Sequence, residues 1–196
     1  MDARCLALCC LVLIILSLAN PLQAAEPVLK PLVPGEPLPF MVVDFVKSPS
    51  TSHCGCPSIM LKNRKNRGVV IWSRGQAEMA CELAQDLDDK FDDRKKTSAF
   101  VIFFSAKDQP KLEEAPKTNL KNFYVSLPRG SSNSSLNRYD LKPSHELFVY
   151  LVDVDKIHAA WSCSSTEFTP EFRRSIVQAA SEFTQPVAEK NATDQP

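Results

Sequence analysis

Residues 68–91, GVVIWSRGQAEMACELAQDLDDKF, decide the fold class of this chain. Residues 69–72 are apolar and mostly β-branched, and a short run of this kind predicts a buried strand. From Ala77 onward apolar residues recur at steps of three and four, which predicts an amphipathic helix ending near Phe91. A buried strand that leads directly into an amphipathic helix is typical of α/β proteins.

The same kinds of pattern continue on both sides of this unit. Continuous apolar runs predict further strands, and the last two have the spacing of a hairpin. These runs are residues 40–45, 99–104, 123–127, 147–152 and 157–163. Two more helices are predicted, one capped by Asp108 and the last capped by Thr169 before Pro170. The order of elements predicts an α/β fold with a central mixed sheet of about five strands and helices on both faces.

The first 25 residues have the layout of a cleaved export signal. Arg4 precedes an apolar run at residues 5–19, and the small residues Ala24 and Ala25 follow it. The run is shorter than the roughly 20 residues that a membrane span needs, so an uncleaved anchor is the less favoured alternative. We therefore predict a signal peptide at residues 1–25 and a secreted or periplasmic protein with no other membrane segment.

The rest of the chain divides into three parts. Residues 26–39 contain five prolines and are predicted to form an extended tether. Residues 40–184 are long enough for one domain with its own core. Residues 185–196 are predicted to be a disordered tail. The charges balance, with 23 Lys and Arg against 23 Asp and Glu, which gives no reason to expect nucleic acid as a partner.

Particular residues make the predicted domain resemble the thioredoxin-like superfamily, especially its secreted peroxiredoxin and TlpA branch. Residues 35–40, GEPLPF, resemble the entry to such domains, and Trp72 resembles the residue that ends their central strand. The resemblance places a Cys-x-x-Cys motif at residues 76–79, which read QAEM, and a cis-proline where Glu146 stands. It therefore implies a thioredoxin-like fold with a degenerate active site.

Cys54-Gly55-Cys56 is the candidate that replaces the missing motif. Removal of the signal leaves four cysteines in an oxidising compartment, where disulfides persist. In an extended chain the two cysteines of the motif are too far apart for a bond, so Gly55 is expected to supply a bend. His53 and the basic residues within 62–67 are expected to favour the thiolate. The hypothesis is thiol-disulfide exchange with protein thiols or disulfides, Cys54 attacking and Cys56 resolving, without a cofactor.

Two other hypotheses remain open beside this one. In the first, the domain is a non-catalytic interaction module in which Cys54 or Cys56 is bonded to Cys163 or Cys81. In the second, His53, Cys54 and Cys56 bind Cu(I), as in copper carriers of the Sco type. If the protein is an enzyme, it is a thiol-disulfide oxidoreductase.

The remaining cysteines and histidines are weaker candidates. Cys81 lies on the apolar stripe of its predicted helix and is expected to be a core thiol, although its distance from Trp72 resembles that of a peroxidatic cysteine. Cys163 lies on the buried face of its predicted strand. His145 and His158 are expected to have no adjacent acid or nucleophile arranged for triad-like work.

Overall fold

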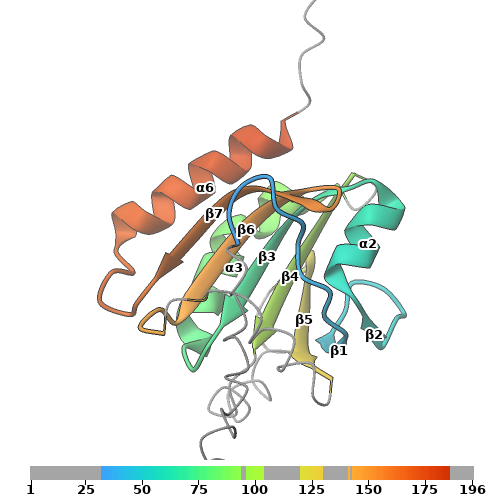
Figure 1. The fold of residues 1–196 in the computed structure, drawn as a ribbon, viewed down its shortest axis with the longest axis horizontal. Helices are drawn as coiled ribbons and strands as arrows, with labels where there is room; N and C mark the ends of the chain where they lie inside the picture. Colours follow the sequence, from blue (N-terminus) through green and yellow to red (C-terminus); the bar gives the residue numbers. More distant parts are fainter. Residues whose placement is uncertain (1–31, 94–95, 104–119, 130–140, 142, 186–196) are drawn as a thin grey trace, which may run out of the picture.

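A computed structural model describes residues 32–93, 96–103, 120–129, 141 and 143–185 (Figure 1). The elements in chain order are β1 (Val43–Lys47), β2 (Cys54–Gly55), α2 (Pro57–Arg64), β3 (Arg67–Ser73), α3 (Ala77–Asp88), the 3-10 turn η1 (Asp89–Phe91), β4 (Thr97–Phe103), β5 (Phe123–Pro128), β6 (Leu147–Asp153), β7 (Lys156–Cys163) and α6 (Pro170–Thr184). The predicted signal peptide, the helix expected at Asp108 and the tail beyond residue 185 lie outside the described residues.

The strands form one seven-stranded mixed sheet in the order β2-β1-β5-β4-β3-β6-β7. Strands β3, β4 and β5 are parallel to one another, whereas the strands on either side of them pair antiparallel. The predicted α/β class and mixed sheet are confirmed. The sheet has more strands than the five or so predicted, partly because β2 has only two residues and no apolar run marks it.

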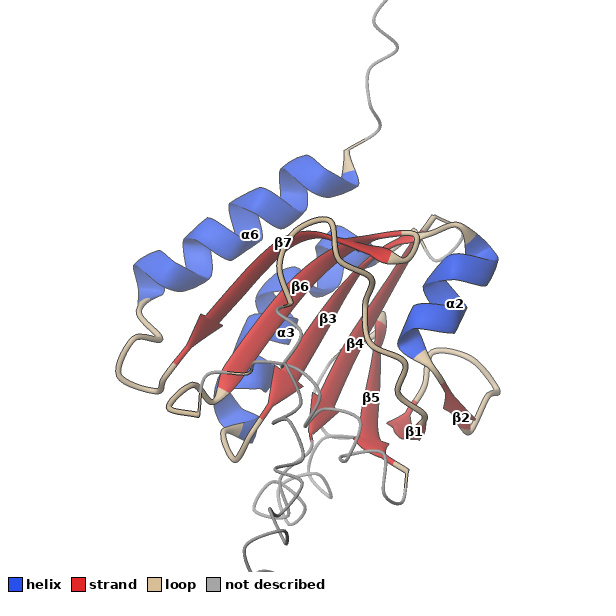
Figure 2. Ribbon diagram, viewed as in Figure 1, coloured by secondary structure: helices blue, strands red, loops and turns tan. Residues whose placement is uncertain are grey.

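Helices cover both faces of this sheet, as predicted. Helices α3 and α6 lie behind the sheet in Figure 2, whereas α2 and the chain leading into β1 lie in front of it. The central strand β3 contributes side chains to the cores on both faces of the sheet, because its side chains alternate between the faces. Val69 and Ile71 pack in the core beneath α3 and α6, and Val70 and Trp72 pack in the core on the α2 side.

The described part of the predicted tether is docked on the sheet. Gly35 N donates to Ile157 O at 2.8 Å, and Ile157 N donates to Glu36 O at 2.8 Å. Leu32 and Leu38 are buried in the core on the α2 side. The prediction of an unpacked tether is therefore wrong for residues 32–39. The prolines allow the extended conformation, and the hairpin between β6 and β7 provides backbone partners for it.

Helix α2 was not predicted from the sequence. The basic run at residues 62–67 contains the end of α2 and the beginning of β3. The helix is eight residues long and buries only Pro57 and Leu61, so no clear apolar stripe announces it. Lys65 ends it in the left-handed conformation with φ 52°.

The C-terminal elements match the sequence predictions closely. β6 and β7 form the predicted hairpin. The Thr169 hydroxyl accepts a hydrogen bond from Phe172 N at 3.2 Å, which confirms the predicted cap of α6. Within the described residues, no helix combines the length and apolar character needed to cross a membrane.

Candidate functional site

The Cys54-Gly55-Cys56 segment lies at the β2 edge of the sheet. Cys54 pairs with Asp44 and Gly55 pairs with Val43, while Val43 also pairs with Pro128 at the end of β5. Because β3 and β5 run parallel, the segment lies at the same end of the sheet as the end of β3. In open α/β sheets, the carboxyl ends of the parallel strands are where ligand sites are usually built.

The segment is extended, and the described cysteines form no disulfide. Cys54 and Gly55 form β2, and Cys56 continues in an extended conformation with φ −128° and ψ 116°. Extended residues two apart have Cα atoms about 7 Å from each other, beyond the roughly 4.4 to 6.8 Å of disulfides. A Cys54–Cys56 bond is therefore incompatible with this backbone conformation and requires β2 to rearrange.

Gly55 does not form the bend that was expected of it. It pairs with β1 in an extended strand, and a Cβ atom there would lie 2.6 Å from Met60 Sδ and 2.9 Å from Phe45 Cζ. The glycine leaves room for the ends of the Met60 and Phe45 side chains, which lie close to its backbone.

The two thiols of the segment differ in environment. Cys54 is exposed, whereas Cys56 is only 6 % exposed. Cys56 is the N-cap residue of α2, and its Sγ lies 3.1 Å from Ser58 Oγ. One cysteine is therefore accessible to a macromolecule, and the other lies at the positive end of a helix dipole.

A bond from this segment to Cys163 is excluded by the topology. β2 and β7 are the opposite edges of the sheet, six strand spacings apart, which is about 28 Å at the usual spacing. Cys163 is buried, and burial, followed by the charges of Glu167 and Glu146, raises its pKa to about 11. Cys163 therefore remains a protonated, unreactive thiol at neutral pH.

Cys81 lies on α3 and is half-buried. It packs against the core between α3 and the sheet. This position agrees with the expectation of a core thiol.

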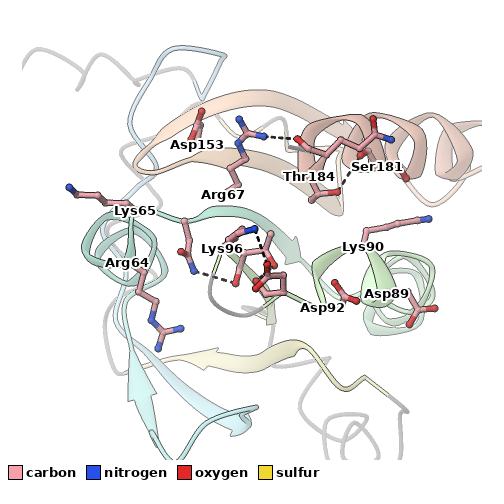
Figure 3. Close-up of a pocket in the computed structure, with 14 residues that line it drawn as sticks. Arg64, Lys65, Arg67, Asp89, Lys90, Asp92, Lys96, Asp153, Ser181 and Thr184 are labelled. Atoms are coloured by element: carbon pink, nitrogen blue, oxygen red, sulfur yellow. Dashed lines mark hydrogen bonds and ion pairs between the residues drawn. The ribbon is translucent and has the colours of Figure 1, made fainter. Parts of the chain in front are cut away.

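The basic residues of the 62–67 run are remote from the thiols. α2 carries them about 12 Å from its N-terminus, given a rise of 1.5 Å per residue over eight residues. There Arg64, Lys65 and Arg67 line a hollow of about 760 Å³ at the opposite end of the sheet (Figure 3). Its lining includes five Lys and Arg side chains and four Asp side chains, so the charges nearly balance. The prediction that this run favours the thiolate is wrong.

The cation beside Cys54 is Arg129, which follows β5. Its Nε donates to Asp44 Oδ1 at 2.8 Å, and its Nη2 donates to the same oxygen. The hydrogen bond to Asp44 and the charge of Asp44 raise the pKa of Arg129, and the nearby Cys54 adds to this effect. Sequence reasoning missed Arg129 because only the strand register brings it to Cys54.

The positions at which the resemblance places a dithiol and a cis-proline contact each other directly. Gln76, the N-cap residue of α3, donates from Nε2 to Glu146 Oε1 at 3.2 Å. The other carboxylate oxygen of Glu146 accepts from Ser165 N at 2.9 Å. No cis peptide bond occurs among the described residues. An amide and a carboxylate therefore occupy this place, and neither is a nucleophile for disulfides.

His145 has two polar neighbours, a hydroxyl and a carboxylate. Its Nδ1 lies 2.8 Å from Ser162 Oγ, and its Nε2 lies 3.8 Å from Glu167 Oε2. That carboxylate oxygen already accepts from Ser164 N and Ser164 Oγ, each at 2.9 Å. The longer contact exceeds a hydrogen bond and falls short of triad geometry, which agrees with the prediction that His145 has no partner arranged for triad-like work. His158 stacks on Phe183, with ring centroids 4.9 Å apart.

The structure does not support the copper hypothesis. The described part of the chain contains no group of three His, Cys, Asp or Glu side chains arranged to hold a metal. Cys54 and Cys56 lie on an extended segment that holds their Cα atoms apart, and His53 precedes it in a bend.

Comparisons with known proteins bear on the fold alone. No family model matches the sequence, and no curated protein matches it. A candidate protein disulfide isomerase from Bacteroides thetaiotaomicron matches with a TM-score of 0.57 at 15 % identity, over 81 % of this chain and 92 % of that one.

Two further solved structures give the same result. The thioredoxin domain of a thiol-disulfide oxidoreductase from Bacteroides vulgatus matches with a TM-score of 0.53 at 14 % identity, over 79 % of this chain and 99 % of that one. AhpC from Mycobacterium tuberculosis matches with a TM-score of 0.52 at 10 % identity, over the same two shares. Together with the sheet topology, these similarities show that the domain has a thioredoxin-like fold.

Proposed function

We propose that this protein is an exported thiol-disulfide exchange protein in which Cys54 attacks and Cys56 resolves. The observation that carries the proposal is the position of an exposed thiol on a two-residue edge strand, at the carboxyl end of a thioredoxin-like sheet. Similar folds in the solved structures include a thiol-disulfide oxidoreductase. The N-terminal 25 residues resemble an export signal. Export would deliver the protein to an oxidising compartment, where a pair of cysteines can exchange disulfides.

The environments of the two thiols suit different roles. A disulfide in another protein can reach Cys54, because that residue is exposed on the edge strand. Cys56 is shielded, and it is the N-cap residue of α2, at the positive end of the helix dipole. Shielding keeps Cys56 from external disulfides and leaves it for the second, internal step.

The exchange proceeds in two balanced steps. The Cys54 thiolate attacks a substrate disulfide, so that a Cys54–substrate bond forms, the substrate's S–S bond breaks and one substrate thiolate leaves. The Cys56 thiolate then attacks Cys54 Sγ, which forms the Cys54–Cys56 bond and expels the second substrate thiolate. Two electrons pass from the protein to the substrate. Cys54 and Cys56 lose their protons to solvent, and the two departing thiolates take up protons from it.

The second step requires β2 to separate from β1. The strand pairs at only two positions, so few hydrogen bonds oppose its opening. The resulting loop is so short that the bond contributes little to stability and is expected to be easily reduced. A bond of this kind suits a redox couple better than a structural cross-link.

The Cys56→Ser variant tests this assignment, because it removes the resolving thiol and leaves Cys54 intact. After incubation with oxidised glutathione, peptide mass spectrometry is expected to find a stable glutathione adduct on Cys54 in the variant. Wild-type protein is expected to resolve the adduct into an internal bond. Equal, persistent adducts on both proteins would rule out Cys56 as the resolving residue.

A second candidate function is a non-catalytic binding module. The contact between Gln76 and Glu146 favours it, because the place that normally holds a dithiol is occupied by a hydrogen-bonded pair. In that case, replacing both Cys54 and Cys56 leaves partner binding intact.

A further inference from the structure

We propose that Arg129 is the positioning residue of Cys54: its guanidinium, held by Asp44, stabilises the Cys54 thiolate that attacks the substrate. This inference rests on the proposed function for its catalytic meaning. The contact that it describes, however, is measurable whether or not the protein exchanges disulfides.

The register of β2, β1 and β5 places the side chains of Cys54, Asp44 and Arg129 on one face of the sheet. Asp44 lies directly opposite Cys54 on β2 and opposite Leu127 on β5. Side chains of directly opposed residues point to the same face. Leu127 packs against the core beneath α3 and α6, which identifies that face. Arg129 stands two residues after Leu127, the spacing that returns a side chain to the same face.

Backbone and side-chain contacts hold the guanidinium in this position. Arg129 N donates to Val42 O at 2.9 Å, which continues the pairing with the segment leading into β1. The Nε and Nη2 groups both donate to Asp44 Oδ1. Cys54 lies directly opposite Asp44 on β2, so the guanidinium that Asp44 holds lies beside the Cys54 side chain. Arg129 is therefore held by Asp44 beside the exposed thiol of Cys54.

The charges at this site predict effects of opposite sign. A thiolate beside a guanidinium is favoured over the neutral thiol, and the thiolate is the reactive form. Asp44 also orients the guanidinium, but its negative charge offsets part of the attraction. Arg129 and Asp44 are 52 % and 48 % exposed, so water and salt weaken both interactions. Loss of Arg129 should lower the rate at which Cys54 reacts, whereas loss of the Asp44 charge should not lower that rate.

The test is the rate at which neutral iodoacetamide alkylates Cys54 at pH 7, followed by mass spectrometry of the peptide that contains it. The Arg129→Gln variant is expected to react about fivefold more slowly than wild type in low salt. The Arg129→Lys variant keeps the charge and is expected to recover most of the rate. Asp44→Asn is expected to react at least as fast as wild type.

Two comparisons separate this role from a merely structural one. Arg64→Gln makes the same change of charge at the far end of α2 and is expected to leave the Cys54 rate unchanged. Added salt is expected to lower the alkylation rate of the wild-type protein more than that of Arg129→Gln, because only the wild type has an attraction to screen.

The inference would be overturned if Arg129→Gln reacted at the wild-type rate, or if Arg129→Lys failed to recover the rate. If the alkylation rates behave as expected but wild type exchanges no disulfide, the proposed function fails and the contact remains.

Discussion

Replacing Cys54 by serine is expected to slow reaction with oxidised glutathione by more than about 100-fold, because a hydroxyl at neutral pH is a far weaker nucleophile than a thiolate. The exposed position of Cys54 means that folding should not change. The measurement is the rate of disulfide transfer in the variant and in wild type, alongside their thermal unfolding curves.

Cys81→Ala is the matched control for this substitution. It removes a thiol at the surface of the core rather than at the β2 edge, so the rate of transfer should stay at the wild-type value. If Cys54→Ser retains the wild-type rate while Cys81→Ala loses it, α3 carries the chemistry and the β2 site is wrongly assigned.

Substitution of Gly68 by alanine is expected to produce the largest loss of stability, about 3 kcal/mol. A Cβ atom on Gly68 would lie 2.6 Å from the backbone carbonyl oxygen of Ser98 and would collide with Leu61 Cδ2. Gly68 pairs directly with Ser98 between β3 and β4, so the central sheet cannot move away easily. In a domain of this size, the loss corresponds to a fall in Tm of roughly 6 to 12 °C.

Gly55→Ala provides the comparison, because the same methyl group is added at the edge of the sheet. The closest contact of the added methyl group would be Met60 Sδ, which belongs to a flexible side chain. Gly55 also lies on β2, which has only two residues. We therefore expect a smaller loss, about 1 kcal/mol. Denaturant unfolding of both variants measures the two losses. The packing described at Gly68 would be contradicted if Gly68→Ala were as stable as Gly55→Ala.

Regular patterns allowed most of the sheet and two helices to be predicted. β3, β4 and the β6–β7 hairpin are apolar runs, and α3 and α6 have clear apolar stripes. β2 and α2 lack such signals, since β2 is two residues long and α2 buries only two side chains. These two elements are held in place by β1 and the sheet rather than by local preference, so tertiary structure decides them.

The candidate thiols could be identified from the sequence, but their electrostatic surroundings could not. The basic run at residues 62–67 is close to Cys54 in sequence, but α2 carries it to the other end of the sheet. Arg129 is far from Cys54 in sequence, and its contact depends on the pairing of β2 with β1 and of β1 with β5. No local pattern encodes that register, so only the structure could find Arg129.

Disulfide mapping of the mature protein equilibrated in glutathione redox buffers tests the central claim most directly. The account predicts that Cys54 and Cys56 form a bond with each other as the buffer becomes more oxidising, while Cys81 and Cys163 stay reduced. A fully oxidising buffer that leaves Cys54 and Cys56 unbonded to each other, or that joins Cys54 to Cys81, would contradict it.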